Sequence, residues 1–143
     1  MIEIQNILDC KRVNKPWGNE IWLQAGSAVY PYALKQLTLL AGQKTSLQVH
    51  EKKSESIVIL SGQGYILYDA NPYDPGRGYT EADLVKFPIA AGAVFHTPPR
   101  TVHRMIAATD LVYIEASTTE LDDVIRIQDD NNRSHGRIDS EHR

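Results

Sequence analysis

The chain has 143 residues, of which 42% are hydrophobic and 23% are charged. This length and composition are those of one globular domain over residues 1–143, which excludes disordered, collagen-like and repeat-array classes. The formal net charge is −3 and the sequence contains no block of basic residues, so no nucleic acid and no anionic membrane surface is expected as the partner. The composition predicts a small-molecule ligand.

The N-terminal region and the cysteine content bear on where the protein works. Residues 1–11 place Glu3, Asn6 and Asp9 among apolar side chains, so they lack the apolar core of a signal peptide. No run approaches the roughly eighteen apolar residues of a membrane span. The single cysteine, Cys10, cannot form an internal disulfide, which favours a reducing compartment. The sequence therefore predicts a cytoplasmic protein.

Short β-rich runs separated by turn residues follow one another along the chain. They predict strands over residues 20–24, 32–40, 56–60, 64–69, 84–88, 93–96, 102–107 and 111–116. Turn signals such as Ala41-Gly42 and Ala91-Gly92 lie between the runs, and no amphipathic helix of ordinary length separates them. The pattern predicts an all-β fold, either an antiparallel sandwich or a barrel.

Two segments depart from this pattern. Residues 71–83 contain two prolines and two glycines and predict a long loop, either a functional lid or a mobile insertion. From residue 118 the composition becomes polar, so we expect a barrel core over residues 12–117 and a C-terminal extension over residues 118–143. In the extension, Val124 and Ile125 can anchor a short turn or strand, whereas the end of the chain, with His135 and His142, is expected to fray.

A group of polar side chains suits metal binding. Gln48 and His50 are two residues apart in a strand-like stretch, so their side chains leave the same face. If residues 51–54 form the turn of a hairpin, Glu55 returns beside them. A second stretch lies further along, where two prolines precede a strand whose first inward side chain would be His103. An amide oxygen, two imidazoles and a carboxylate suit one divalent metal ion, with zinc as the first choice and iron, manganese or nickel as alternatives.

The spacing of these residues resembles the paired motifs of the cupin superfamily. The first motif would run from Gly42 through the ligands to Gly62, and the second from Gly92 to His103. The resemblance implies a double-stranded β-helix, or jelly-roll barrel, with its metal inside the mouth. The sequence departs from the usual pattern at three positions, since Gln48, Arg100 and Ala107 replace a histidine, a glycine and an asparagine.

Further matches are similar to the isomerase domain of type II mannose-6-phosphate isomerases. They begin with the Ser-x-Gln-x-His run at residues 46–50 and span residues 12–133. The other matching runs are Lys15-Pro16-Trp17-Gly18, residues 44–48, His103-Arg104 and residues 121–126. The resemblance implies a metal-dependent isomerase that interconverts an aldose and a ketose, with a sugar or sugar phosphate as substrate. Type II enzymes often carry a nucleotidyltransferase domain ahead of the isomerase domain.

Four further residues are candidate catalytic groups. Lys35 is a charge within an apolar strand, and the family has a lysine at this place. Lys53 shares the strand parity of Glu55 and would be a substrate-facing cation, although it can equally be a solvated turn lysine. His96 can be catalytic or a surface histidine. Arg104 matches the family, although strand parity points it away from the metal.

Isomerisation also requires a general base, and a phosphate on the substrate would require a cationic site. The candidates for the base are Lys35, His96 and Glu51. The candidates for the phosphate are Lys53, Arg100 and Arg104.

Other readings remain open at this stage. With iron bound, the barrel could act as a dioxygenase, although the amide of Gln48 is a weaker donor for a redox iron than imidazole. A non-catalytic sugar-binding module is the other alternative. Small jelly-roll barrels often cover an edge strand by pairing with a second copy, so the sequence also predicts a homodimer.

Overall fold

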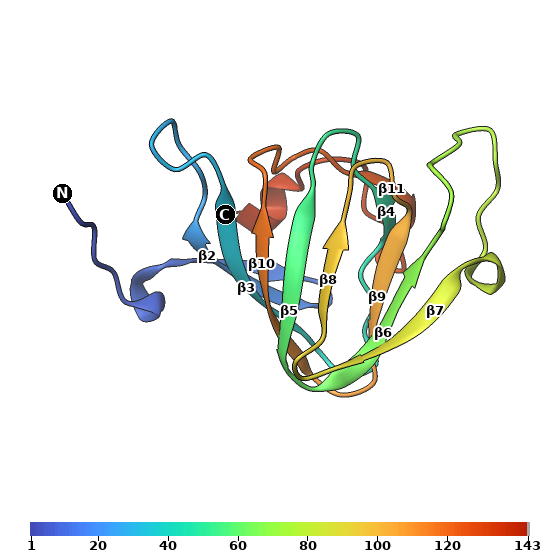
Figure 1. Cartoon of the computed structure of the whole chain (residues 1–143), viewed down its shortest axis with the longest axis horizontal. Coiled ribbons are helices and arrows are strands. Elements are labelled where there is room, and N and C mark those ends of the chain that lie inside the picture. Colours follow the sequence, from blue (N-terminus) through green and yellow to red (C-terminus); the bar gives the residue numbers. More distant parts are fainter. Residues whose placement is uncertain (143) are drawn as a thin grey trace.

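The fold consists of two antiparallel β-sheets that face each other (Figure 1). A computed structural model describes residues 1–142. The six-stranded sheet has the order β1 (Lys11–Lys15), β2 (Gly18–Gln24), β3 (Ala33–Leu39), β10 (Leu111–Ser117), β5 (Glu55–Ser61) and β8 (Val94–Thr97). The five-stranded sheet has the order β11 (Ile125–Gln128), β4 (Leu47–Val49), β9 (His103–Ala107), β6 (Gln63–Tyr68) and β7 (Val85–Ala90).

Helical structure is limited to short 3-10 turns. These are η1 (Ile7–Asp9), η2 (Glu81–Asp83) and η3 (Asp139–His142). None of them, nor any other helix in residues 1–142, is long and apolar enough to reach across a membrane. The predicted all-β class is confirmed, and each predicted strand corresponds to an observed one, with boundaries that differ by a residue or two.

The hairpin expected around residues 51–54 is wrong. Strand β4 belongs to the five-stranded sheet, where it pairs with β9 and β11, whereas β5 belongs to the other sheet. The backbone N–H groups of residues 51–53 donate to the Asp123 carboxylate and not to a neighbouring strand. This side chain lets the segment cross from one sheet to the other with its donors satisfied.

The space between the sheets is apolar at one end and charged at the other. Leu37, Ile59 and Met105 belong to the buried cluster that joins the two sheets. Further along the same strands, inward positions change to charged residues, such as Lys35 on β3 and Glu115 on β10. Strand alternation thus creates both a core and a polar pocket from the same inner faces.

The loop over residues 71–83 does not cover this pocket. Its Tyr79 packs with Leu84, Leu67 and Val102 in a second buried cluster, which includes residues of the five-stranded sheet. None of its residues lines the pocket. The loop therefore closes the outer face of that sheet, and the lid alternative is not supported by its position.

The C-terminal extension does not fray within the described residues. Glu141 of η3 accepts an ion-pair contact from Lys15 of β1 at 2.8 Å, and the His142 ring meets the edge of the Trp22 ring with centroids 5.4 Å apart. These contacts fold the end of the chain back onto the barrel, where η3 contacts β1. Figure 1 marks this end of the chain near the six-stranded sheet. The sequence pattern alone could not show this because the anchoring residues are more than 100 positions earlier.

The close approach of β2 to β3 leads to a prediction at Gly18. A Cβ atom at this position would lie 1.9 Å from the Thr38 carbonyl oxygen, and strand pairing prevents the backbone from moving away. Gly18→Ala is expected to lower the free energy of unfolding by about 1–3 kcal/mol, because overpacking forces backbone shifts. Denaturant titration measures the change. Gly78→Ala is the matched control, since nothing lies within 4 Å of its added Cβ, and equal stability of the two variants would contradict the prediction.

Candidate metal centre and pocket

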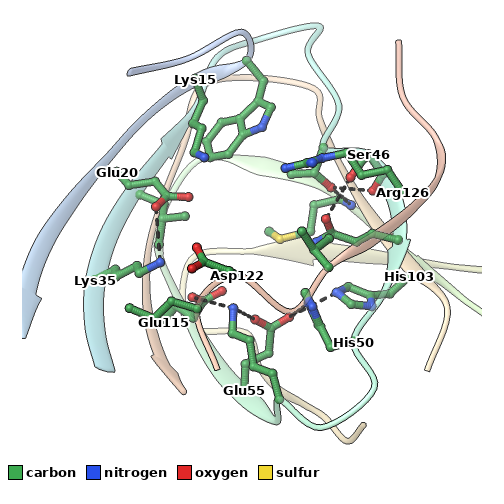
Figure 2. A pocket seen from close by; sticks show the side chains of 18 of the residues that line it. Lys15, Glu20, Lys35, Ser46, His50, Glu55, His103, Glu115, Asp122 and Arg126 are labelled. Atoms are coloured by element: carbon green, nitrogen blue, oxygen red, sulfur yellow. Dashed lines mark hydrogen bonds and ion pairs between the residues drawn. The ribbon is translucent and has the colours of Figure 1, made fainter. Parts of the chain in front are cut away.

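His50, Glu55 and His103 come together at the charged end of the barrel (Figure 2). His50 follows β4, His103 begins β9 in the same sheet, and Glu55 begins β5 in the opposite sheet. One ligand atom from each residue lies within 4.8 Å of the other two, and all three side chains are buried. Glu55 Oε1 is 3.1 Å from His103 Nε2 and 3.8 Å from His50 Nε2.

Both imidazoles are oriented for a metal ion. His50 Nδ1 contacts the Asp123 carbonyl oxygen at 2.6 Å, and His103 Nδ1 contacts the Thr101 carbonyl oxygen at 2.8 Å, so each Nδ1 is the donor. Each Nε2 is buried and without a hydrogen-bond partner among residues 1–142. Unsatisfied buried acceptors are costly, and histidine metal ligands characteristically donate their other ring N–H to a carbonyl. The site therefore fits a divalent cation.

Electrostatics keep these ligands in their metal-binding forms. Burial lowers the pKa of His50 to about 4, although the negative charge of Glu55 acts to raise it. The imidazole is therefore neutral at neutral pH. Burial by itself would raise the pKa of Glu55, but the Lys53 ammonium and His103 outweigh it and hold this pKa well below its usual value. A neutral imidazole and an ionised carboxylate are the forms that bind metal.

Gln48, the fourth ligand predicted from the sequence, lines the same pocket. It is the cross-strand partner of His103, so the two side chains leave the same face of the sheet. Its amide oxygen accepts a hydrogen bond from the Ser46 hydroxyl at 2.8 Å. Its role as a ligand remains a prediction.

Lys53 links the ligand group to a second carboxylate. Its Nζ is 3.3 Å from Glu55 Oε2 and 3.6 Å from Glu115 Oε2, and the lysine is buried, which excludes the solvated-turn alternative. Burial disfavours the ammonium form, but Glu115 and Glu55 together raise the pKa of Lys53 above its usual value. Burial and the charge of Glu55 raise the pKa of Glu115 to about 8, so this carboxyl group carries a proton at neutral pH.

Lys35 forms a second buried ion pair on the same wall. Its Nζ is 3.3 Å from Glu20 Oε1 and 4.5 Å from the centre of the Trp22 ring. Burial would raise the pKa of Glu20, but Lys35 and Lys15 lower it below its usual value. Lys35 is the cross-strand partner of Glu115 in the pairing of β3 with β10. The Lys35–Glu20 ion pair therefore lies next to the Lys53–Glu115 contact.

The C-terminal extension lines the mouth of the pocket. The free volume of the pocket is about 110 Å³. Arg126 donates to the carbonyl oxygens of Ser134 and Gly136. The cationic side chains near the mouth are Lys15, Arg126, Arg133, Arg137 and, when protonated, His142.

Other predicted residues lie elsewhere. His96 is exposed on β8, with its Nδ1 2.7 Å from the Ser56 hydroxyl. Arg104 points to the opposite face from His103, as strand parity predicts, and contacts Thr45, Glu81 and Asp130. Neither residue lines the pocket.

The remaining candidates from the sequence pair with each other outside the pocket. Glu51 Oε2 accepts from the Arg100 guanidinium at 2.5 Å, and neither residue lines the pocket. Arg100 has a positive φ of 63°, which explains why glycine is usual at this place in the motif. Its backbone N–H donates to the His50 carbonyl oxygen at 2.7 Å, so this turn helps to hold a ligand.

Sequence reasoning missed three functional candidates. Glu20 and Glu115 alternate with apolar residues in their strands, and this inward parity is the signal that could have identified them. The third is Asp123, which holds the backbone of residues 51–53 and orients the His50 ring.

Two curated proteins are similar to the chain. The putative mannose-1-phosphate guanylyltransferase of Vibrio cholerae is 25% identical over 115 residues, which cover 80% of this chain and 22% of that protein. The mannose-1-phosphate guanylyltransferase of Escherichia coli is 25% identical over 128 residues, which cover 90% of this chain and 23% of that protein. The chain thus spans less than a quarter of their length. No protein-family model matches the sequence.

Solved structures with the same fold belong to cupin-type proteins. The capsular polysaccharide assembling protein CapF of Staphylococcus aureus matches with a TM-score of 0.62 and 14% identity, over 90% of this chain and 32% of that chain. Bacillus subtilis oxalate decarboxylase, a protein with Mn(II) centres, matches with a TM-score of 0.64 and 17% identity, over 84% of this chain and 30% of that chain. An RmlC-like cupin of Desulfovibrio desulfuricans matches with a TM-score of 0.58 and 22% identity, over 83% of this chain and 98% of that chain.

These similarities and the paired sheets establish the fold as a cupin-type jelly-roll barrel, as the motif spacing predicts. The buried His-Glu-His group within it fits a metal-binding cupin. The closer resemblance to type II mannose-6-phosphate isomerases stays a prediction.

Metal binding is the first test of this site. Zinc or manganese is expected to bind one ion per chain by calorimetry and to raise the melting temperature, because only the folded protein holds the three ligands together. His103→Ala is expected to weaken metal binding by at least about 100-fold. The loss of a ligand should reduce metal affinity more than the loss of a residue that only orients a ligand. His96→Ala is the matched control and should bind like the wild type. Unchanged affinity in His103→Ala would disprove the assignment.

The second test concerns Asp123. Asp123→Ala removes the acceptor of three backbone N–H groups and is expected to loosen the turn that carries His50. Metal affinity should fall by about 10–100-fold, the usual effect of losing a partner that orients a ligand. Glu120→Gln, an exposed change in the same segment, should leave affinity unchanged. If both variants bind metal equally well, Asp123 has no such role.

Proposed function

We propose that this protein is a metal-dependent isomerase that interconverts an aldose and a ketose, with a sugar or sugar phosphate as substrate. The observation that carries the proposal is the combination in one pocket of a His-Glu-His group, the buried Lys35–Glu20 ion pair and the buried contact of Lys53 with Glu115. Buried charges are costly unless they are paired, and perturbed ionisable groups in a pocket mark candidate functional sites.

The reaction moves one proton between adjacent carbons. A base takes the proton from C2 of the aldose, and the resulting enediolate receives a proton at C1. The hydroxyl proton of O2 passes to O1, so substrate and product contain the same atoms and electrons. A divalent cation at His50, Glu55 and His103 would supply positive charge beside the carbonyl and hydroxyl oxygens.

The groups that handle the proton come from the pocket wall. Glu115 and Glu55 both contact the Lys53 ammonium, so the carboxyl group of Glu115 lies next to the ligand group. We assign the transfer at carbon to Glu115. Its pKa of about 8 keeps most molecules protonated at neutral pH, and the ionised fraction acts as the base. Lys35 is the other candidate for the base. Lys35 and Lys53 also place positive charge where the negative enediolate oxygens would develop. His96 and Glu51 are excluded from this role by their positions outside the pocket.

The pocket mouth supports an anionic group on the substrate. Arg126, Arg133 and Arg137 line the pocket. Of the phosphate candidates from the sequence, Arg100 and Arg104 pair with carboxylates outside the pocket, and Lys53 contacts Glu55 and Glu115 within it. Guanidinium groups suit phosphate oxygens because they form paired hydrogen bonds.

The curated relatives support a mannose derivative as substrate. Both are named as mannose-1-phosphate guanylyltransferases, and the chain matches less than a quarter of each. A partial match to a nucleotidyl-transferring protein is consistent with the two-domain organisation common in type II mannose-6-phosphate isomerases.

The direct experiment incubates metal-loaded protein with mannose 6-phosphate and measures fructose 6-phosphate. We expect turnover that chelation abolishes. Glu115→Gln should reduce kcat by about 100-fold or more while metal affinity is retained, because a general acid–base group contributes about 10²–10⁴-fold. His96→Ala should retain activity, since this exposed side chain does not line the pocket.

Other outcomes would replace the proposal. No conversion of any aldose, phosphorylated or free, by metal-loaded protein would reject the isomerase. Tight sugar binding without conversion would favour a sugar-binding module, and iron-dependent oxygen consumption would favour a dioxygenase.

A further inference from the structure

A carboxylate of the C-terminal extension lies between two cations of the pocket wall. Glu141 Oε1 is 2.8 Å from Lys15 Nζ, and Glu141 Oε2 is 3.4 Å from Arg133 Nη1. The side chains of Glu141, Lys15 and Arg133 are 9%, 11% and 8% exposed, so the three charges are almost completely removed from water. Both cations line the pocket that contains the His-Glu-His group. The protein thus carries an anion of its own on two cations of this pocket.

Elements other than η3 position both cations. Asp129 accepts from Arg133 Nε at 2.9 Å and from Arg133 Nη2 at 3.2 Å, which fixes the guanidinium plane and leaves Nη1 for Glu141. Lys15 belongs to β1, where it pairs with Gly18 at the start of β2. Buried charges are costly unless they are paired. The two cations would therefore still attract an anion if Glu141 moved away.

The turn that carries Glu141 has little apolar anchorage. The 3-10 turn η3 has no buried residue, and none of its residues belongs to the two apolar clusters described above. Its side chains meet the barrel through the Glu141 ion pairs and through the edge of the His142 ring against the Trp22 ring. Segments with few buried apolar contacts open locally at little cost in free energy. Detachment of η3 would leave the barrel core intact.

We propose that Glu141 is an internal competitor for an anion site formed by Lys15 and Arg133, and that a phosphate-bearing ligand occupies this site by displacing Glu141 together with η3. Carboxylate and phosphate oxygens accept the same charge-assisted hydrogen bonds from ammonium and guanidinium groups. A phosphate group carries a charge of about −1.5 to −2 at neutral pH, which is more than that of a carboxylate. Phosphate is therefore suited to replace Glu141 on the two cations.

The place of this site suits a ligand that spans the pocket. Figure 2 shows Lys15 on the opposite side of the pocket from His50 and Glu55. A sugar phosphate held at Lys15 by its phosphate group would direct its other end toward the metal ligands. This identification of the ligand rests on the proposed function, whereas the competition between Glu141 and an anion does not.

Competition predicts the sign of a measurable effect. A site that is open in only a fraction of the molecules binds its ligand more weakly by that fraction. Removal of the Glu141 charge should therefore strengthen anion binding. If Glu141 were only a structural tether, its removal would loosen the pocket mouth and leave anion binding unchanged or weaker.

Calorimetry with inorganic phosphate and metal-loaded protein tests this sign. Glu141→Gln retains the shape of the side chain and should lower the dissociation constant about tenfold, as for a site open in about one molecule in ten. Glu120→Gln is the matched control, because it removes the same charge from an exposed position of the extension outside the pocket and should bind phosphate like the wild type. Addition of Lys15→Gln to Glu141→Gln should cancel the gain, which distinguishes this site from phosphate binding at the metal.

Hydrogen exchange in the wild-type chain follows η3 directly and does not depend on any variant folding. Phosphate should accelerate exchange at residues 139–142 and leave β10 protected. The proposal is overturned if phosphate does not bind, if Glu141→Gln binds it no more tightly than the wild type, or if bound phosphate leaves exchange in η3 unchanged. Isomerase turnover is measured separately, and its absence would reject the proposed function without affecting this competition.

Discussion

The Glu55 carboxylate, buried between two imidazoles and an ammonium group, is the constraint on which the site depends. One oxygen faces His50 and His103, and the other faces Lys53. A buried carboxylate is tolerated only with such partners, so its ionisation, the neutral His50 imidazole and the lysine charge are coupled. Glu55 also stands on the sheet opposite both histidines, which makes closure of the barrel a requirement for assembling the ligands.

The polypeptide around the site supports this arrangement from outside the barrel core. Asp123 of the C-terminal extension holds the turn after His50, and the backbone N–H of Arg100 holds the His50 carbonyl group. Lys15 then ties the end of the same extension to β1 through Glu141. The polar extension is therefore part of both the metal centre and the pocket mouth, and its loss would disturb both.

The two sheets differ in which groups lie on their faces. The five-stranded sheet is sealed by the loop of residues 71–83 through Tyr79, which explains a long insertion that contributes nothing to the pocket lining. The six-stranded sheet places Lys35 and Glu115 on its inner face, where they meet the pocket and where the proposed chemistry requires ionisable groups.

The sequence by itself predicted eight of the eleven strands in residues 1–142, the all-β class and the ligand types, because pleat alternation and turn residues act over a few neighbouring positions. It also identified His50, Glu55 and His103 through their motif spacing. Only the tertiary structure decided that β4 and β5 lie in different sheets and that Asp123 fills the role assigned to a hairpin. It also placed Glu115 beside Lys53 and separated His96 from the pocket. These features depend on pairing between distant segments, whose partners local patterns do not specify.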